Sequence, residues 1–351
     1  MPGATFIDLF CGAGGASCGF QQAGAQPVLG VDEDSAALDA WERNVHGETS
    51  CATLTPENAA EALPPAARGM HLHASAPCQL LSRQRLGGTS EELQAGLRLF
   101  RLSMELPLLR GDHTWSSEQV SSPPAVKLAA AMTKRFPDRV DFAIVDAADF
   151  GAPSTRSRLI VGPPRLIARL RKMGTAPRVS MRDAFRTYGL EVPEGAVAVT
   201  MSRGAASPKN KPRRLDGVGF TVLASHPMTW LDSDGKSLGC LTWRHSAALM
   251  GFGPEWRFPK TTRAAQRAAG NAVPPPLAKA IMIAAIQVQH GSPDLPPPLE
   301  PSELMGVGES APPAPPRSSP PRPTPTDGTE MLLAIDRIQA ELDKLRRMVV
   351  P

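Results

Sequence analysis

Cys78 is a residue whose chemistry could define a site, because it directly follows a proline in the stretch SAPCQLLS (75–82). A cysteine thiolate is a strong nucleophile that can add to an electron-poor carbon, which is the basis of covalent catalysis. A free cysteine is also a small and usually buried hydrophobic residue. The stretch alone favours this second interpretation, so residues elsewhere in the chain must decide.

A glycine-rich turn is the second candidate for chemistry. The stretch DLFCGAGGASCGF (8–20) places Gly12, Gly14 and Gly15 between a predicted strand and a predicted helix, where glycines let the backbone turn sharply and approach a ligand. The next predicted strand ends at Asp32, and an acid in that position can accept the hydroxyls of a ribose. The pair predicts a nucleoside-containing cofactor and leaves NAD and S-adenosylmethionine open. The structural alternative for the acids 32–34 is the solvated start of a helix.

Several further segments share an order that is specific to one family. They are APCQLLS (76–82), SSEQV (116–120), TRSRLIVG (155–162), LTWRHSAALMGFGPEWRF (241–258) and GNAVPP (270–275). Together with DLFCGAGG, their order and spacing resemble the DNA cytosine-5 methyltransferase family over residues 4 to about 290, apart from a basic insert. The resemblance implies an α/β, Rossmann-like, S-adenosylmethionine-dependent methyltransferase fold with a mostly parallel sheet and a small basic target-recognition region.

The resemblance implies that Cys78 is the nucleophile of a covalent mechanism. Its thiolate would add to C6 of cytosine, so that C5 becomes enamine-like and can accept a methyl group. Glu118 would bond to the N3 and N4 edge of the base, and Arg158, with Arg156, would meet the O2 side and help to hold the cysteine loop. The base must leave the duplex to reach such a pocket, so double-stranded DNA is the implied partner.

The resemblance also implies a binding site for S-adenosylmethionine. The residues that would line it are Phe10, Gly12, Gly14, Asp32, Glu33, Asn271 and Val273. Asp32 would hold the ribose and Glu33 would lie beside the adenine, while the last two residues would return from the far end of the chain. No metal is predicted, because histidines, cysteines and acids lack metal-ligand spacing.

Four positions depart from the family pattern. Gln119 stands where the family has asparagine in Glu-Asn-Val, and Ser154 stands where it has glutamine. The stretch ETSCATL (48–54) has no clear match for an acid that contacts the adenine, and His245 replaces a glutamate. These departures leave open whether the chain retains full activity.

The elements that must position these residues follow from alternating apolar strand-like runs and helical stretches. Predicted strands are ATFIDLF, QPVLGVD, MHLHASA, DFAIVDA and RLIVGP, and predicted helices are DSAALDAWERN, SSPPAVKLAAAMTKRF and PPLAKAIMIAAIQV. This alternation predicts βαβ units and a parallel sheet.

Composition shifts divide the chain into five parts. We expect a catalytic and cofactor-binding domain made of residues 4–162 and 241–290, with the target-recognition region, 163–240, between these two pieces. A Pro-rich disordered linker, 291–327, and a C-terminal helix, 328–349, follow. Residues 163–214 hold twelve Lys or Arg and three acids, which suits contact with DNA phosphates. Residues 292–326 hold thirteen prolines, which predicts an extended spacer. Apolar residues at steps of three and four then predict a short coiled coil that joins copies or a partner, or a helix packed back on the body.

The bulk composition limits the remaining alternatives. With 42% hydrophobic residues, a net charge of +4 and five cysteines without a CxxC pair, the chain reads as an intracellular globular protein without a secretion signal or membrane span. An active DNA methyltransferase is the leading hypothesis. A DNA-binding or regulatory protein that lost turnover, an RNA cytosine methyltransferase and a Rossmann dehydrogenase are the alternatives, although the last leaves Pro-Cys and Glu118 unexplained. The recognition sequence cannot be predicted.

Overall fold

The central element of the structure is a seven-stranded sheet with the strand order β3-β2-β1-β4-β5-β7-β6. The computed structural model describes residues 3–55, 58–59, 63–81, 90–201, 211–291 and 296–304. The strands are β1 (Thr5–Leu9), β2 (Gln26–Asp32), β3 (Glu48–Cys51), β4 (Met70–Ala74), β5 (Thr114–Val120), β6 (Asp141–Asp146) and β7 (Ser157–Gly162). Only β7 runs antiparallel to its neighbours in this sheet, so the carboxyl ends of the other strands meet at one edge.

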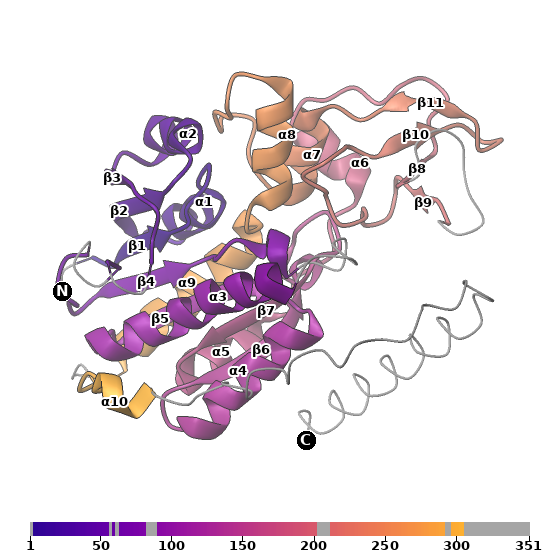
Figure 1. Ribbon diagram of the computed structural model, residues 1–351. Helices are drawn as coiled ribbons and strands as arrows, with labels where there is room; N and C mark the ends of the chain where they lie inside the picture. Colours follow the sequence, from indigo (N-terminus) through magenta and orange to yellow (C-terminus); the bar gives the residue numbers. More distant parts are fainter. Residues whose placement is uncertain are drawn as a thin grey trace, which may run out of the picture. The chain divides into compact units, whose positions relative to one another are not determined.

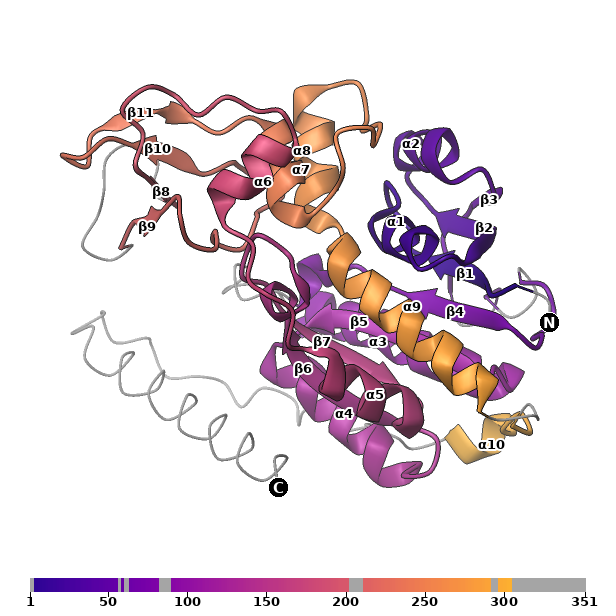
Figure 2. The same cartoon turned by 180° about the vertical axis from the view of Figure 1, so that it is seen from behind.

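Helices cover both faces of the sheet (Figures 1 and 2). The first face carries α1 (Gly15–Gln22), α2 (Ser35–Val45), α5 (Pro164–Met173) and α9 (Pro275–His290), and the second carries α3 (Ser90–Arg110) and α4 (Pro123–Arg135). A separate apolar core fills each interface: Phe20, Trp41 and Ile281 belong to the first, and Phe100 and Trp115 to the second. The predicted α/β fold with a mostly parallel sheet is confirmed.

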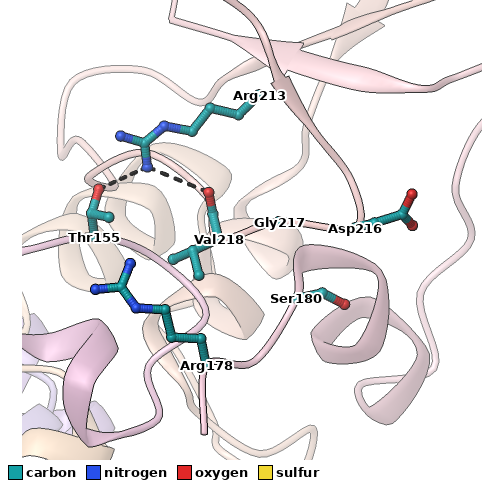
Figure 3. A pocket seen from close by; sticks show the side chains of 7 residues that line it. All are labelled: Thr155, Arg178, Ser180, Arg213, Asp216, Gly217 and Val218. Carbon is teal, nitrogen blue, oxygen red and sulfur yellow. Dashed lines mark hydrogen bonds between the residues drawn. The ribbon is translucent and has the colours of Figure 1, made fainter.

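A smaller region follows the large sheet in sequence. It contains α6 (Met181–Thr187) and a four-stranded sheet in the order β11-β10-β8-β9, with β8 (Ala198–Thr200), β9 (Arg213–Arg214), β10 (Thr229–Leu231) and β11 (Ser237–Cys240). Next come α7 (Trp243–Met250) and α8 (Thr262–Asn271). The region is joined to the body at a short bridge between Ser154 and Gly219, and Arg213 donates to the neighbouring Thr155 hydroxyl (Figure 3).

Strand β5 is an element that hydrophobic patterning did not predict. Its sequence TWSSEQV is polar, yet its first six residues are buried. Hydrogen bonds explain this: Ser116 Oγ lies 2.9 Å from His71 Nε2 and 2.7 Å from His73 Nδ1, both on β4. Burial lowers the pKa of both histidines to about 3, so they stay neutral and serve as structural hydrogen-bond partners of β5.

Helix α5 corrects the predicted start of the recognition region. The sequence assigns residues 163–240 to that region, but α5 packs on α9 and β6 within the large body, with Leu166, Ile167 and Leu170 fully buried. Its amphipathic pattern was hidden among its cations. The part that we expect to read the target, for which we keep the name recognition region, therefore begins after α5, at about residue 174.

The beginning of the predicted linker is also ordered. Residues 296–304 lie against α3, where Leu299 N–H donates to Leu108 O at 2.9 Å and the Arg101 guanidinium donates to Leu304 O at 2.9 Å. The short helix α10 (Pro301–Leu304) buries Leu304 in the second core. For these nine residues the expectation of a disordered spacer is wrong, because two leucines and backbone hydrogen bonds dock them.

The predicted C-terminal helix, 328–349, lies outside the described residues. Within the described part of the chain, no single helix has the length and apolar character to cross a bilayer. Helices α8 and α9 reach that character only as a pair bent by 41°, and α9 is largely buried in the first core.

Candidate functional site

Cys78 lies at the edge of the sheet where the parallel strands end. It begins a short 3-10 turn, Cys78–Leu80, four residues after β4, and Pro77 directly precedes it. The thiol side chain is half-buried. Strand β5 neighbours β4 and carries Glu118, while β7 neighbours β5 and carries Arg158 near its start. The strand order therefore brings the three predicted catalytic residues to one edge.

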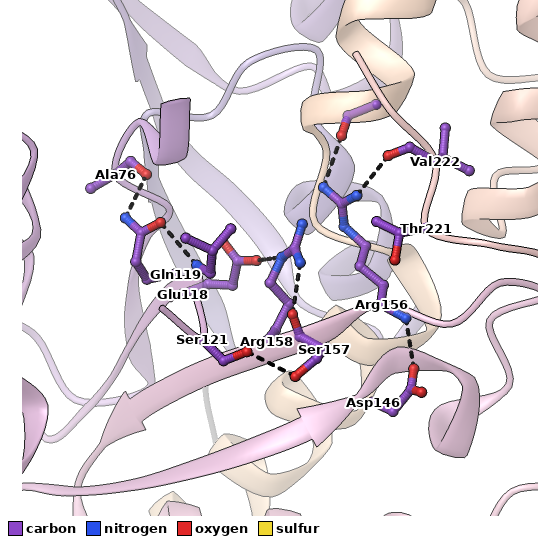
Figure 4. A network of polar contacts seen from close by, with 12 residues as sticks. Ala76, Glu118, Gln119, Ser121, Asp146, Arg156, Ser157, Arg158, Thr221 and Val222 are labelled. Atoms are coloured by element: carbon purple, nitrogen blue, oxygen red, sulfur yellow. Dashed lines mark hydrogen bonds and ion pairs between the residues drawn. The ribbon is translucent and has the colours of Figure 1, made fainter. Parts of the chain in front are cut away.

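Glu118 and Arg158 form a buried ion pair (Figure 4). Arg158 Nε lies 2.6 Å from Glu118 Oε1, and each side chain is 8% exposed. Arg158 also donates through Nη1 to the carbonyl of Ser157 at 2.7 Å. Because both partners are held at a low local dielectric, the carboxylate is oriented before any ligand arrives.

The charge environment of Cys78 is set by this pair and by Arg156. Burial is the main cause that raises the pKa of the Cys78 thiol, and the Glu118 carboxylate raises it further. The Arg158 and Arg156 guanidinium groups oppose this and lower it. In the free protein the thiol is therefore mainly protonated at neutral pH, and nearby positive charge is available to stabilise a thiolate.

Arg156 occupies a different position from Arg158. It is fully buried, with Nη1 donating to Val222 O at 3.0 Å and Nη2 donating to Gly270 O at 2.8 Å (Figure 4). Burial lowers the pKa of its guanidinium to about 9. Arg156 thus ties β7 to both the recognition region and the Gly-Asn segment, and its positive charge reaches Cys78 without a direct bond.

Gln119, one of the departures from the family pattern, contacts the cysteine loop. Its Nε2 donates to the carbonyl of Ala76 at 3.2 Å, and its Oε1 accepts from the Val120 N–H at 2.9 Å (Figure 4). The side chain is completely buried. The longer amide therefore bridges β5 to the residue that precedes Pro77, and this function could not be read from the sequence.

The glycine-rich turn and Asp32 form the second half of the site. Phe10, Gly12 and Gly14 all have positive φ angles, of 56°, 53° and 87°. The Asp32 carboxylate accepts from the N–H groups of Gly12 at 2.8 Å and Asp34 at 2.9 Å. Burial is the main cause that raises the pKa of Asp32. Asp32 thus fixes the conformation of the turn at Gly12, which is half-buried, whereas Ala13, Gly14 and Gly15 are buried.

This half of the site fits an adenosine-containing cofactor. A Cβ atom at Gly12 would meet no atom within 4 Å, so there is open space next to the turn. Each Asp32 oxygen keeps lone-pair capacity for ribose hydroxyls. The exposed Glu33 lies at the end of β2, where the Thr53 hydroxyl donates to its carboxylate at 3.1 Å. Thr53 belongs to the ETSCATL stretch, so a hydroxyl lies where the family acid was sought.

The far end of the chain closes this half from behind. The backbone of Val273 approaches Gly15 so closely that a Cβ there would lie 2.6 Å from Val273 O. Asn271 is the exposed last residue of α8. Trp256, which the sequence did not single out, donates from its indole N–H to Ala13 O at 3.1 Å. Val273 and Trp256, which lie far from the glycine-rich turn in the sequence, therefore pack directly against it.

The two remaining departures have structural partners. The Ser154 hydroxyl donates to Leu249 O at 2.7 Å, which ties the approach to β7 to α7. His245 forms a capping box with Thr242 at the start of α7, and its Nε2 lies 3.1 Å from Glu191 O. Ser154 therefore ties α7 to the large body, and His245 ties α7 to the recognition region.

The predicted basic insert divides between two places. Four of its twelve cations, at 165, 169, 171 and 172, lie on α5 of the large body, and those at 203 and 209 lie outside the described residues. Several of the rest form ion pairs, including Arg178 with Asp149, Arg182 with Asp216 and Arg186 with Asp183. The positive charge of the recognition region is thus smaller than the count suggests. Among the residues described, no group of three His, Cys, Asp or Glu side chains could hold a metal ion.

Comparison with known sequences gives one family and individual relatives. The chain matches the family described as C-5 cytosine-specific DNA methylase over residues 4–100 and 200–287, which include Cys78 and Asn271. It is 27% identical over 300 residues to the Type II methyltransferase M.AplI of Arthrospira platensis, covering 78% of this chain and 83% of that protein. It is 24% identical over 324 residues to the Type II methyltransferase M1.HphI of Haemophilus parahaemolyticus, covering 81% and 87%.

Solved structures share the fold at low sequence identity. The S. pombe Dnmt2 methyltransferase superposes with a TM-score of 0.54 at 15% identity, covering 82% of this chain and 99% of that one. The Entamoeba histolytica methyltransferase EhMeth superposes with a TM-score of 0.56 at 12% identity, covering 83% and 99%.

Proposed function

Because the chain belongs to the C-5 cytosine-specific DNA methylase family, we propose that it transfers a methyl group from S-adenosylmethionine to C5 of a flipped-out cytosine through a covalent bond between Cys78 and C6. The observation that carries this mechanism is the position of Cys78 within the electrostatic field of the buried Glu118–Arg158 pair. The glycine-rich turn on β1 of the same sheet supports the cofactor assignment.

Each side chain has a defined part in the mechanism. The Cys78 thiol gives its proton to solvent and its sulfur bonds to C6, while the electrons of the C5–C6 double bond move toward C5. Glu118 binds the N3 and N4 edge and favours a proton on N3 as charge develops, and Arg158 holds that carboxylate and faces the O2 side. Arg156 is a positioning residue, because its guanidinium donates to backbone carbonyls. Its charge stabilises the thiolate from nearby.

The cofactor supplies an electrophilic methyl group carried on a sulfonium. Phe10, Gly12 and Gly14 would line its site, and Asp32 would hold its ribose, with Glu33 near the adenine. Asn271 and Val273 would close the site from the far end of the chain. Loss of the methyl group would leave the cofactor as a neutral thioether. Solvent then takes the C5 proton, the electrons of that bond restore the C5–C6 double bond, and the sulfur–C6 bond breaks to release the Cys78 thiolate, which takes up a proton again.

We assign DNA reading to the recognition region from about 174 to 240. Its arginines suit phosphate contacts and guanine edges in double-stranded DNA. This substrate implies a compartment that contains DNA. The names of the two Type II relatives favour a role in restriction–modification. The bonds of Gln119 and Ser154 favour an active enzyme over a regulatory protein that lost turnover, because both departures are accommodated at the site.

Methyl transfer from labelled S-adenosylmethionine tests this function. The wild type should label duplex DNA, and bisulfite sequencing should place the label on C5 of cytosine. Cys78→Ser should abolish transfer and keep cofactor binding, whereas the matched control Cys240→Ser, at an exposed cysteine on β11, should leave transfer unchanged. DNA binding without transfer would favour the regulatory alternative, transfer to RNA alone would change the substrate, and transfer by Cys78→Ser would disprove the covalent mechanism.

The tail 328–349 is proposed to associate with a second copy or a partner. Sedimentation of the full chain and of residues 1–327 tests this. Association through the tail is supported if its deletion lowers the mass of the sedimenting particle by more than the mass of the deleted residues. Monomers in both cases favour a helix packed on the body.

A further inference from the structure

A pocket of about 460 Å³ lies where the body meets the recognition region (Figure 3). We call it the seam pocket. Thr155, just before β7, lines it from the body, and the recognition region and its connection to α5 provide the other lining residues, which are Arg178, Ser180, Arg213, Asp216, Gly217 and Val218. The seam pocket therefore exists only when both parts of the molecule are in place.

Arg213 is a fixed cation in the seam pocket. Its Nη1 donates to Thr155 Oγ1 at 2.9 Å and to Gly219 O at 2.6 Å. Its guanidinium carbon also lies 4.3 Å from the centre of the Phe220 ring. Because these contacts already restrict the side chain, an anion that binds there does not have to immobilise it.

Arg178 is a second cation whose partner can be exchanged. It pairs with Asp149 at 2.8 Å, but the two side chains are 58% and 39% exposed. An exposed pair of this kind contributes little to stability, because solvent screens it. A phosphate group, which presents several anionic oxygens to a guanidinium, can therefore replace Asp149 at small cost.

The charges around the seam pocket sum to an excess of positive charge. Arg182 pairs with Asp216 at 2.8 Å, and Arg182 and Arg214 together lower the pKa of that carboxyl. Asp146 also acts on Arg213, and Asp183 accepts from the Ser180 hydroxyl and pairs with Arg186, so five arginines, at 178, 182, 186, 213 and 214, stand against four aspartates, at 146, 149, 183 and 216. The local field favours an anion.

The segment that lines the seam pocket from the body continues along the chain into the candidate catalytic site. The Thr155 N–H donates to Gly219 O at 2.9 Å, and the Thr221 hydroxyl donates to Thr155 O at 2.7 Å. Thr155 is three residues before Arg158 in the chain. A duplex that delivers a base to Glu118 and Arg158 carries phosphates on both sides of that base, and these are the anions that we expect at this boundary.

We propose that the seam pocket binds a phosphodiester group of the DNA that flanks the flipped-out cytosine, with Arg213 as the fixed donor and Arg178 as the exchangeable one. The inference rests on the proposed function, since it presumes a DNA substrate. Inorganic phosphate has the same chemistry, so the experiment must separate the two sources.

The salt dependence of DNA binding tests the proposal. Affinity for a mixed-sequence duplex is measured by fluorescence anisotropy between about 50 and 200 mM salt, because each neutralised phosphate contributes a slope of about −0.9 in log K against log salt. Arg178→Gln should reduce the steepness by about 1, and Arg178→Lys should retain it. The matched control is Arg171→Gln on α5, which removes an arginine paired to Asp141 at 2.9 Å on the body.

Each outcome has one meaning. An unchanged slope for Arg178→Gln, or an equal loss for Arg171→Gln, overturns the proposal. Titration with inorganic phosphate at constant ionic strength provides the other arm: millimolar binding that needs Arg178 and leaves DNA binding unaffected assigns the pocket to free phosphate and also overturns it. Methyl transfer by the wild type on the same DNA is measured in parallel. If the wild type transfers methyl groups and Arg178→Gln leaves the salt slope unchanged, only this inference is refuted. If Arg178→Gln reduces the salt slope and the wild type transfers no methyl group, only the proposed function is refuted.

Discussion

Replacing Gln119 tests whether the unusual amide positions the catalytic cysteine. Gln119→Ala removes the bond to Ala76 O and the bond from the Val120 N–H, and both groups lie in or beside the buried core. A buried group left without its partner costs about 1–3 kcal/mol, so the free energy of unfolding should fall by about 2–4 kcal/mol. If misplacement of the cysteine loop raises the activation free energy of methyl transfer by about 1–2 kcal/mol, kcat falls about 5- to 30-fold.

Gln119→Asn is the more discriminating variant, because asparagine is the residue that the family pattern has at this position. Its side chain is shorter by one carbon–carbon bond of about 1.5 Å, and the present bond to Ala76 O is already 3.2 Å long. In this chain the shorter amide cannot reach unless β5 or the loop moves. We therefore expect a kcat between those of the wild type and Gln119→Ala.

The assay is steady-state methyl transfer combined with urea unfolding. KM for S-adenosylmethionine should change little, because Gln119 lies on β5, whereas the predicted cofactor residues lie in the turn after β1, at the end of β2 and around the end of α8. Gln266→Ala is the matched control. Gln266 is a buried glutamine on α8 that donates to the backbone carbonyl of Leu223 at 2.7 Å, so its replacement should lower stability with a smaller effect on kcat. If Gln119→Asn equals or exceeds the wild type in both kcat and stability, the amide is not fitted to this loop and the reasoning fails.

The remaining predictions concern the turn and the strand that carries it. Gly15→Ala places a Cβ 2.6 Å from Val273 O, so about 1–3 kcal/mol of stability and most affinity for S-adenosylmethionine should be lost; calorimetric titration measures this, and equal affinity would contradict it. Gly174→Ala, where the new atom has ordinary contacts of 3.4 Å or more, is its control. Burial raises the pKa of Asp8 to about 7, so the folded state holds its proton and this group's contribution to stability declines as pH rises from about 4 to 7. Asp8→Asn should remove that decline, and its stability relative to the wild type should improve by about 2–3 kcal/mol from pH 5 to pH 8 in urea unfolding. The same relative stability at both pH values would show that Asp8 does not titrate in this range.

Several parts of the molecule were predictable because their signals are local. The glycines after β1 and the acid that ends β2 mark a turn whose conformation depends on neighbouring residues, and the positive φ of Gly12 and its bond to Asp32 agree with that prediction. The apolar runs of β1, β2, β4, β6 and β7 likewise identify strands of the sheet from the sequence. The order of the segments around Cys78 and Glu118 was sufficient to identify the family.

Other features depend on partners that are distant in sequence. Polar β5 is buried because histidines on β4 satisfy its serines, and a hydrophobic pattern contains no record of such a bond. The place of α5 follows from packing on a helix that begins about a hundred residues later, and residues 296–304 dock because α3 offers them hydrogen-bond partners.

The division is clearest in the site itself. Residue type determined that Cys78 can be a nucleophile and that Glu118 and Arg158 can bind a polar base. Only the tertiary structure decided that Arg158 pairs with Glu118, that Arg156 bonds to Val222 and Gly270, and that the extra methylene of Gln119 reaches the cysteine loop. The physical reason is that a hydrogen bond or ion pair depends on differences of less than an ångström between separate strands, and the packing of the whole sheet sets those distances.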